Sequence, residues 1–193
     1  MSLTYLSEFA GVGGDSEGAQ RVDGLTPIFA ANHNQDAIDS HQANHPDVEH
    51  WCGDVQNAGG TPTFPYADLF WGSPACPDFT TSKGVKRTFD TENQMSLWDA
   101  EKSPEALAEE AAAKRSRALM EEVIIYLETW HRRGKIVKGG VVENVVEARA
   151  WAHWQRWIKR FEGMDYIVRL IALNSMHALA PSSRRCVQSR NRL

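Results

Sequence analysis

Cysteine is scarce in this chain, and long apolar runs are absent. The three cysteines, Cys52, Cys76 and Cys186, are too few and too scattered for a disulfide framework or a zinc site. No run of about 18 apolar residues occurs, so we expect no membrane span. The first residues do not show a basic segment followed by an apolar one, so we expect no signal peptide. These absences favour a cytoplasmic protein without a bound metal.

An excess of basic residues is also missing. The formal net charge of −4 argues against a protein that coats nucleic acid nonspecifically. It does not exclude a DNA enzyme, because a local patch or a further domain can contact the phosphates. Four arginines do gather at the end of the sequence: Arg184, Arg185, Arg190 and Arg192. We expect residues 185–193 to form a disordered basic tail.

The order of apolar segments predicts an α/β fold. We expect strands at 3–9, 27–31, 49–55, 67–71, 137–143 and 166–173, and helices at 16–21, 36–44, 104–132 and 147–161. This alternation predicts a Rossmann-like, mostly parallel sheet with helices on both faces. Residues 80–101 show little periodicity and are expected to form a long loop. Trp151, Trp154, Ile158 and Phe161 lie at helical spacing, which favours a place in the core over a base-stacking surface.

Residues that follow the predicted strands are candidates for a binding site. In such sheets ligands bind beyond the carboxyl ends of the strands. The segment Phe9-Ala10-Gly11-Val12-Gly13-Gly14 follows the first strand, where glycines allow a sharp turn and close approach to a ligand. Its spacing is not the dinucleotide pattern G-x-G-x-x-G, which argues against NAD. By itself the segment is equally consistent with an ordinary tight turn.

Polar residues follow the second and third strands. Asn32 and His33 come after the second strand, and Asp54 comes after the third. A carboxylate there can accept a hydrogen bond from an adenine amine. The alternative is that Gly53 and Asp54 only form a turn. The histidines His33, His131, His153 and His177 do not show metal-ligand spacing.

Two further residues can carry covalent and acid chemistry. Cys76 follows the fourth strand between Pro74 and Pro77, in a loop that cannot be helical. An exposed thiol with a lowered pKa there would be a nucleophile, whereas most single cysteines are small buried residues. Glu143 ends the fifth strand, where a desolvated carboxyl can act as an acid. The alternative for Glu143 is an ordinary strand end at the surface.

Taken together, these motifs resemble those of the C5-cytosine-specific DNA methyltransferases. The glycine turn resembles their first motif, Gly53-Asp54-Val55 the third, Gly72 to Thr80 the fourth, Ser116 to Leu119 the fifth, Glu143-Asn144-Val145 the sixth, and Asn174 to Arg184 the eighth. The resemblance implies S-adenosylmethionine as cofactor. The residues that it assigns to cofactor binding are Phe9, Ala10, Gly11, Gly13, Gly14, Asn32, His33, Asp54, Val55 and Ala75.

The resemblance also implies a reaction. Double-stranded DNA would be the partner, with the target cytosine flipped out of the stack. Cys76 would attack C6 of the ring, Glu143 would protonate N3, and C5 would take the methyl group. Asn144 and Arg184 belong to the same catalytic set. A methyltransferase acting on RNA through the same cysteine chemistry is a less favoured alternative.

The sequence departs from the family pattern in several places. His33 stands where the family has an acidic residue, and Ala75 and Pro77 flank the cysteine where the family has Pro and Gln. In the eighth motif Ser182 and Cys186 replace Gln and Arg.

The family continues with a further strand, a target-recognition domain and a final motif, which the residues after Arg184 do not provide. We therefore expect a catalytic domain at 1–184 that is incomplete at its C-terminal side, with a gap between the fifth and sixth strands. It would be part of an enzyme that needs a second polypeptide, or a degenerate fragment that only binds cofactor or partner. A restriction–modification system is one setting for such a protein.

Overall fold

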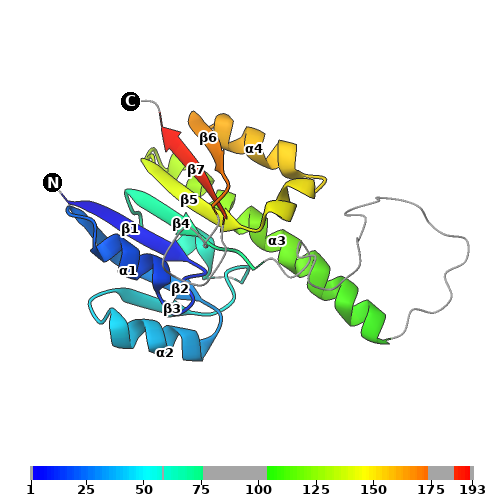
Figure 1. The fold of residues 1–193 in the computed structure, drawn as a ribbon, viewed down its shortest axis with the longest axis horizontal. Helices are drawn as coiled ribbons and strands as arrows, with labels where there is room; N and C mark the ends of the chain where they lie inside the picture. Colours follow the sequence, from blue (N-terminus) through cyan, green and yellow to red (C-terminus); the bar gives the residue numbers. More distant parts are fainter. Residues whose placement is uncertain (1, 58, 76–103, 174–184, 192–193) are drawn as a thin grey trace, which may run out of the picture.

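Seven strands in the described part of the chain form one sheet (Figure 1). The computed structural model describes residues 2–57, 59–75, 104–173 and 185–191, and for 104–117, 147 and 185–191 the backbone alone. In chain order the strands are β1 (Leu3–Glu8), β2 (Leu25–Asn32), β3 (Glu49–Cys52), β4 (Leu69–Gly72), β5 (Gly139–Asn144), β6 (Tyr166–Ile171) and β7 (Arg185–Asn191). The helices are α1 (Gly14–Gln20), α2 (Gln35–Asn44), α3 (Pro104–Arg132) and α4 (Trp154–Glu162), with short 3-10 helices η1 (Thr61–Thr63) and η3 (Val146–Ala150).

The sheet has the order β3-β2-β1-β4-β5-β7-β6. In this order the five strands β3, β2, β1, β4 and β5 are parallel to one another, and β7 is antiparallel to both β5 and β6. This confirms the predicted mostly parallel sheet of the Rossmann-like class. The parallel order also brings the carboxyl ends of β1 to β5 to one edge, where the candidate site residues lie.

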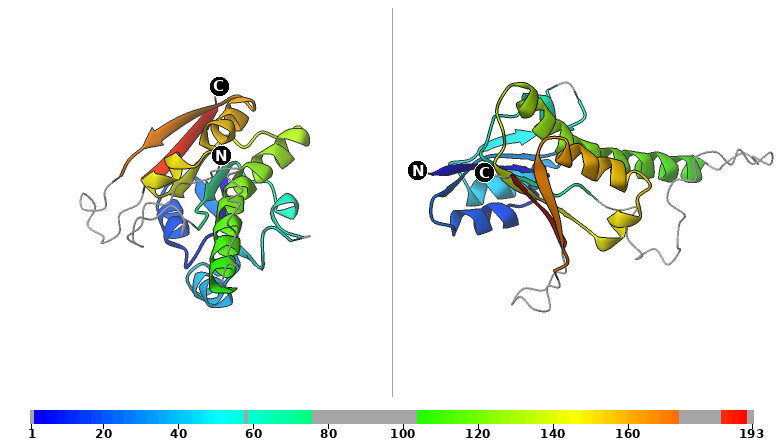
Figure 2. Two further views of the ribbon diagram at one scale, coloured as in Figure 1. Left: turned by 90° about the vertical axis from the view of Figure 1, so that its right-hand side faces the viewer. Right: turned by 90° about the horizontal axis from the view of Figure 1, so that it is seen from above.

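Helices cover both faces of the sheet, as predicted. Figure 2 shows α1 and α2 on one side of the strands and α3 on the other. The alternation of side chains along β1 explains this arrangement, because successive residues of a strand point to opposite faces. The hydroxyl of Tyr5 donates to Asp15 of α1, whereas the next residue, Leu6, is fully buried in the core that α3 and α4 help to form.

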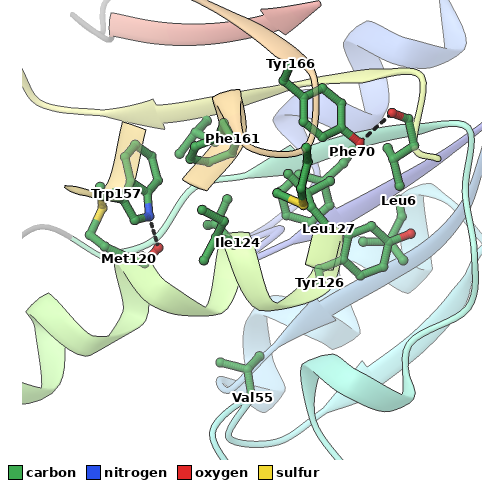
Figure 3. Close-up of a cluster of buried hydrophobic side chains, with 14 of the residues drawn as sticks. Leu6, Val55, Phe70, Met120, Ile124, Tyr126, Leu127, Trp157, Phe161 and Tyr166 are labelled. Carbon is green, nitrogen blue, oxygen red and sulfur yellow. Dashed lines mark hydrogen bonds between the residues drawn. The ribbon is translucent and has the colours of Figure 1, made fainter. Parts of the chain in front are cut away.

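The main core lies between the sheet and the helices α3 and α4 (Figure 3). Along α3 the buried side chains recur at helical spacing: Met120, Val123, Ile124 and Leu127. The indole of Trp157 donates to the carbonyl of Met120 at 2.8 Å, and the hydroxyl of Tyr166 donates to the carbonyl of Val137 at 2.7 Å. Trp157 and Tyr166 are thus buried with their hydrogen bonds satisfied.

One predicted helix is interrupted. The expected helix at 147–161 is instead the 3-10 helix η3 followed by α4, and the break falls at Trp151. Trp151 has extended backbone angles (φ −62°, ψ 128°) and is buried. The backbone leaves the helical conformation there while the Trp151 ring stays in the same core as Trp154. The prediction that the aromatic stripe belongs to the core is confirmed.

The prediction of a disordered tail, and with it a gap in the sheet, is wrong. Residues Arg185–Asn191 form β7, which pairs along its length with β5 and with β6. The segment was missed because its sequence lacks an apolar run. It forms a strand because of its position between β5 and β6, where its backbone hydrogen bonds to both neighbours. The sheet therefore extends beyond the expected domain end at residue 184.

The face of the sheet beside α1 carries an apolar groove. A cavity of about 860 Å³ lies between α1 and the strands β4 and β5, with Tyr5, Leu69, Trp71 and Val141 among the residues that line it. Lys138 and Arg169 also line it. None of the helices in the described ranges combines the length and apolarity needed to cross a membrane.

Candidate active site

The turn after β1 has an unusual backbone. Phe9, Gly11 and Gly13 have positive φ angles of 64°, 55° and 96°. The amide of buried Ala10 donates to the carbonyl of Ala31 on β2 at 2.9 Å, and the amide of Gly13 donates back to the carbonyl of Ala10 at 3.1 Å. A Cβ added at Gly11 or Gly14 would meet nothing within 4 Å. The turn is therefore closed on itself and open on the side where a ligand can approach.

Histidines support the opposite side of this turn. A Cβ at Gly13 would lie 2.8 Å from Nε2 of His45 and 2.9 Å from His41. His41 is itself held by Oγ of Ser16 at 3.0 Å and by His50 at 2.8 Å. Burial, with the neighbouring His45 and His50, lowers the pKa of His41 to about 4, so it is neutral at neutral pH. Sequence reasoning did not single out these histidines; His41 lies in the last turn of α2, and His45 is its C-cap.

The ends of β2 and β3 lie beside each other. The amide of Gly53 donates to the carbonyl of Asn32 at 3.0 Å. The Asn32 side chain is partly buried and accepts from the amide of Asn34 at 2.9 Å, while His33 is exposed. Asp54 is partly buried, and its Oδ1 accepts from the amide of Gln56 at 3.2 Å. His33 and Asp54 thus lie at this edge of the sheet, and Asn32 shapes the turn between them.

A hydrogen bond joins the ends of β4 and β5. The side-chain amide of Asn144 is buried and donates to the carbonyl of Pro74 at 3.2 Å. Its Oδ1 accepts from the amide of Val145 at 2.8 Å, which fixes the orientation of the side chain. Glu143 is partly buried and Ala75 is exposed. The Glu-Asn pair is therefore attached to the loop whose next residues include Cys76.

The predicted site residues fall into two groups. The structure places the residues after β1, β2, β3 and β4, and those at the end of β5, along one edge of the sheet. Cys76 and Arg184, together with the long loop expected at 80–101, lie outside the described residues. Within the described ranges, no group of three or more acidic, histidine or cysteine side chains has the geometry of a metal site.

One buried acidic residue at this edge was missed. Glu8, the last residue of β1, is 0% exposed although it lies in a segment predicted as an apolar strand. The signal in the sequence is a carboxyl at a position where neighbours on both sides are apolar or small. Its partners come from distant parts of the chain, so the sequence alone did not show what surrounds it.

Comparison with solved structures finds this architecture in methyltransferases. The S. pombe Dnmt2 methyltransferase matches with a TM-score of 0.67 at 16% identity, over 100% of this chain and 51% of that one. The Entamoeba histolytica methyltransferase EhMeth matches with a TM-score of 0.67 at 13% identity, over 100% and 54%. A putative DNA modification methyltransferase encoded within an E. coli prophage matches with a TM-score of 0.62 at 21% identity, over 98% and 47%. The chain thus spans about half the length of these proteins.

Sequence comparison identifies the family. No curated protein sequence matches the chain. The model of the C-5 cytosine-specific DNA methylase family matches residues 3–106, which include the glycine turn, the Asp54 loop and the segment around Cys76. Together with the fold and the arrangement of the strand ends, this match shows that the chain belongs to the C-5 cytosine-specific DNA methylase family.

Proposed function

We propose that this chain is the catalytic part of a DNA (cytosine-5-)-methyltransferase, transferring a methyl group from S-adenosylmethionine to C5 of cytosine in DNA. The observation that carries the proposal is the hydrogen bond from Asn144 to Pro74. It attaches the end of β5, with Glu143, to Pro74, which precedes Cys76 by two residues in the sequence. An acid and a nucleophile that act on one ring need such a fixed relation.

The residues at the strand ends fit S-adenosylmethionine. The turn after β1 has its open side at Gly11, where a Cβ would meet no atom within 4 Å. Phe9, Ala10, Gly13 and Gly14 form the rest of this turn. Asp54 would accept a hydrogen bond from the adenine amine, and Val55 would lie beside the adenine. His33 and Asn32 would lie near the ribose. Ala75 would border the methyl group. When bound, the cofactor supplies the methyl group that C5 of the activated ring takes up.

The remaining steps belong to side chains of this chain. The Cys76 thiolate adds to C6 of the flipped cytosine, which forms an S–C6 bond and moves electrons toward C5. Glu143 supplies a proton at N3 as this charge develops, and Asn144 holds the strand end in place. After methylation, loss of the proton from C5 restores the C5–C6 double bond and expels the Cys76 thiolate. Arg184, which aligns with the first arginine of the eighth motif, belongs to the same catalytic set.

Further polypeptide is part of the proposal. The structural relatives are about twice as long as this chain. A target-recognition domain would supply the contacts to base edges that give sequence specificity. The apolar groove between α1 and β4–β5 supports an additional segment that packs on this face. Double-stranded DNA would then be bound between two parts of the enzyme in the cytoplasm, with a restriction–modification system as one setting.

The alternative is a fragment that binds S-adenosylmethionine or a partner without turnover. The replacements in the eighth motif, Ser182 and Cys186, favour this reading, since they remove groups that the family uses near the base. The two readings share the cofactor site and differ in whether Cys76 reacts.

Covalent trapping separates these readings. The protein is mixed with S-adenosylmethionine and duplex DNA carrying 5-fluorocytosine in varied sequence contexts. Fluorine at C5 blocks the final elimination, so a working enzyme stays attached to the DNA after denaturation. We expect an adduct that is lost in Cys76→Ser. A folded protein that binds the cofactor without an adduct would support the fragment, and an adduct with RNA instead of DNA would contradict the proposed substrate.

A further inference from the structure

Two buried carboxyl groups lie behind the candidate cofactor site. Glu8 ends β1 directly before the glycine turn and is 0% exposed, and Glu122 on α3 is 7% exposed. Buried carboxyls are uncommon unless they are paired with a cation or hold a proton. The proposed reaction uses neither of them. Their surroundings therefore call for a role of their own.

Thr61 connects these carboxyls to the Asp54 loop. Its hydroxyl donates to Oε1 of Glu8 at 2.5 Å, across 53 residues of sequence. Its backbone amide donates to the carbonyl of Val55, the residue after Asp54, at 3.2 Å. A Cβ added at the preceding residue, Gly60, would lie 1.9 Å from the same carbonyl, so the loop passes too close for any other residue.

The backbone of Glu8 adds a third connection. Its carbonyl accepts from the amide of Ser73, in the loop after β4, at 3.1 Å. Glu8 is thus hydrogen bonded to the loops that follow β3 and β4 and is followed at once by the turn after β1. Among the described residues, Oε2 of Glu8 has no hydrogen-bond partner.

The charges around Glu8 favour a neutral carboxyl. Burial raises the pKa of Glu8 to about 8, the hydrogen bond from Thr61 opposes this, and Glu122 raises it further. Burial also raises the pKa of Glu122, as do the charges of Asp54 and Glu121, whereas hydrogen bonding with Thr61 and Gln56 lowers it. Tyr126, the other titratable group that interacts with Glu8, has a raised pKa through burial and is neutral. These neighbours are neutral or acidic, so Glu8 carries its proton at neutral pH.

We propose that Glu8, Thr61 and Glu122 form a positioning cluster that fixes the glycine turn relative to the Asp54 loop, and that loss of the proton from Glu8 loosens both segments and weakens cofactor binding. The charged Glu8 would be buried beside a second carboxyl, and the described residues that act on its pKa include no cation. Relieving that cost requires movement of Thr61 or of β1, and each movement displaces one of the two segments. This inference rests on the proposed function only in taking S-adenosylmethionine as the ligand.

The test measures two quantities across pH in the same protein. Thermal unfolding of the protein without ligand measures how stability depends on the protonation of Glu8. Calorimetric titration with S-adenosylmethionine measures how the affinity of the site depends on it. For the wild type we expect a bend, meaning a change of slope near the Glu8 pKa of about 8, when the unfolding temperature and the affinity for S-adenosylmethionine are each plotted against pH. Above this point the affinity should fall by up to about tenfold per pH unit, the limit for linkage to one proton. In Glu8→Gln, which keeps the shape without the charge, both profiles should lose this bend.

Three further variants sharpen the result. Thr61→Val removes the hydrogen bond that favours the charged form of Glu8, so the bend should move to higher pH. Glu122→Gln removes a neighbouring negative charge, so the bend should move to lower pH. Glu128→Gln is the matched control, because this carboxyl elsewhere on α3 pairs with Arg160 and should leave the bend in place.

Each outcome is decisive. An unchanged bend in Glu8→Gln, or shifts of the same sign in Thr61→Val and Glu122→Gln, would overturn the cluster. A bend in unfolding without one in the affinity would overturn its positioning role. If the wild type does not bind S-adenosylmethionine at any pH, the proposed cofactor fails, while the unfolding profiles still decide whether Glu8 holds the proton.

Discussion

At the scale of single residues, the turn after β1 depends on what each glycine touches. Gly11 and Gly14 face open space, whereas Gly13 packs directly on His45 and His41. Gly13 also has a φ of 96°, a conformation that costs residues with a Cβ about 1–2 kcal/mol. The first motif of the family thus has two kinds of glycine here, one kind that leaves room for a ligand and one that seats the turn on α2.

Replacing Gly13 should therefore damage the site. Gly13→Ala places a methyl group 2.8 Å from Nε2 of His45 and adds backbone strain. We expect stability to fall by about 1–3 kcal/mol and the affinity for S-adenosylmethionine to fall by more than about tenfold. Urea denaturation and calorimetry measure the two effects.

Gly18→Ala is the matched control for this substitution. It lies in α1, where an added Cβ meets nothing within 4 Å, so alanine should be neutral or stabilise by about 0.5–1 kcal/mol. Equal cofactor affinity in the two variants would show that the packing of Gly13 against His45 does not affect cofactor binding.

At the scale of secondary-structure elements, α2 supports the site without contributing a predicted contact. It begins after His33 and Asn34, carries His41, and ends at its C-cap His45, the two histidines that lie beside Gly13. Its first turn is capped by Asn34, whose Oδ1 accepts from the amide of Ala37 at 3.0 Å. The cap fixes where α2 starts, and with it the position of the segment from Asn32 to Asn34.

Removing this cap should lower stability by a predictable amount. Asn34→Ala leaves the Ala37 amide without its side-chain acceptor and should cost about 1 kcal/mol in urea denaturation. Asn34→Asp keeps an acceptor and adds a negative charge at the helix N-terminus, so it should retain or raise stability. Equal losses in both variants would mean that Asn34 does not act as a cap.

At the scale of the whole molecule, β7 determines whether the sheet is continuous. It pairs with β5 on one side and β6 on the other. Without it, both neighbours would present unpaired backbone groups, and such edges promote aggregation. The pairing also connects β6 and α4 to the parallel strands through backbone hydrogen bonds.

A proline within β7 tests this role. Val187 pairs with Val142 on β5 and with Leu170 on β6, so Val187→Pro removes a backbone donor in the middle of the sheet. We expect a loss of about 3 kcal/mol or more and a lower yield of monomer in size-exclusion chromatography. Val187→Ala keeps the amide and serves as the control. A proline variant that matches the alanine variant would contradict the inner position of β7.

Much of the fold followed from the sequence because its signals are local. Apolar strands and periodic apolar stretches such as 104–132 can each be recognised from their own residues, and the site residues follow once parallel strands share an edge. The failures have non-local causes. β7 lacks an apolar run, and its pairing depends on β5 and β6. The break at Trp151 interrupts a helical periodicity that continues across it. The role of Glu8 depends on Thr61 and Glu122, which lie far along the chain.

The place of β7 also sets an order for folding. β6 follows β5 in the chain but cannot join the sheet beside it, because β7 lies between them. The register pairs Gly139 with Arg190, about fifty residues apart in the sequence. Pairing β7 with β5 must therefore close a long loop, and this entropic cost makes the pairing a late step in folding. A chain emerging from the ribosome would therefore carry β6 unpaired until β7 is made. During that interval the unpaired strand edges of β5 and β6 would be exposed, and a chaperone that shields them would matter most.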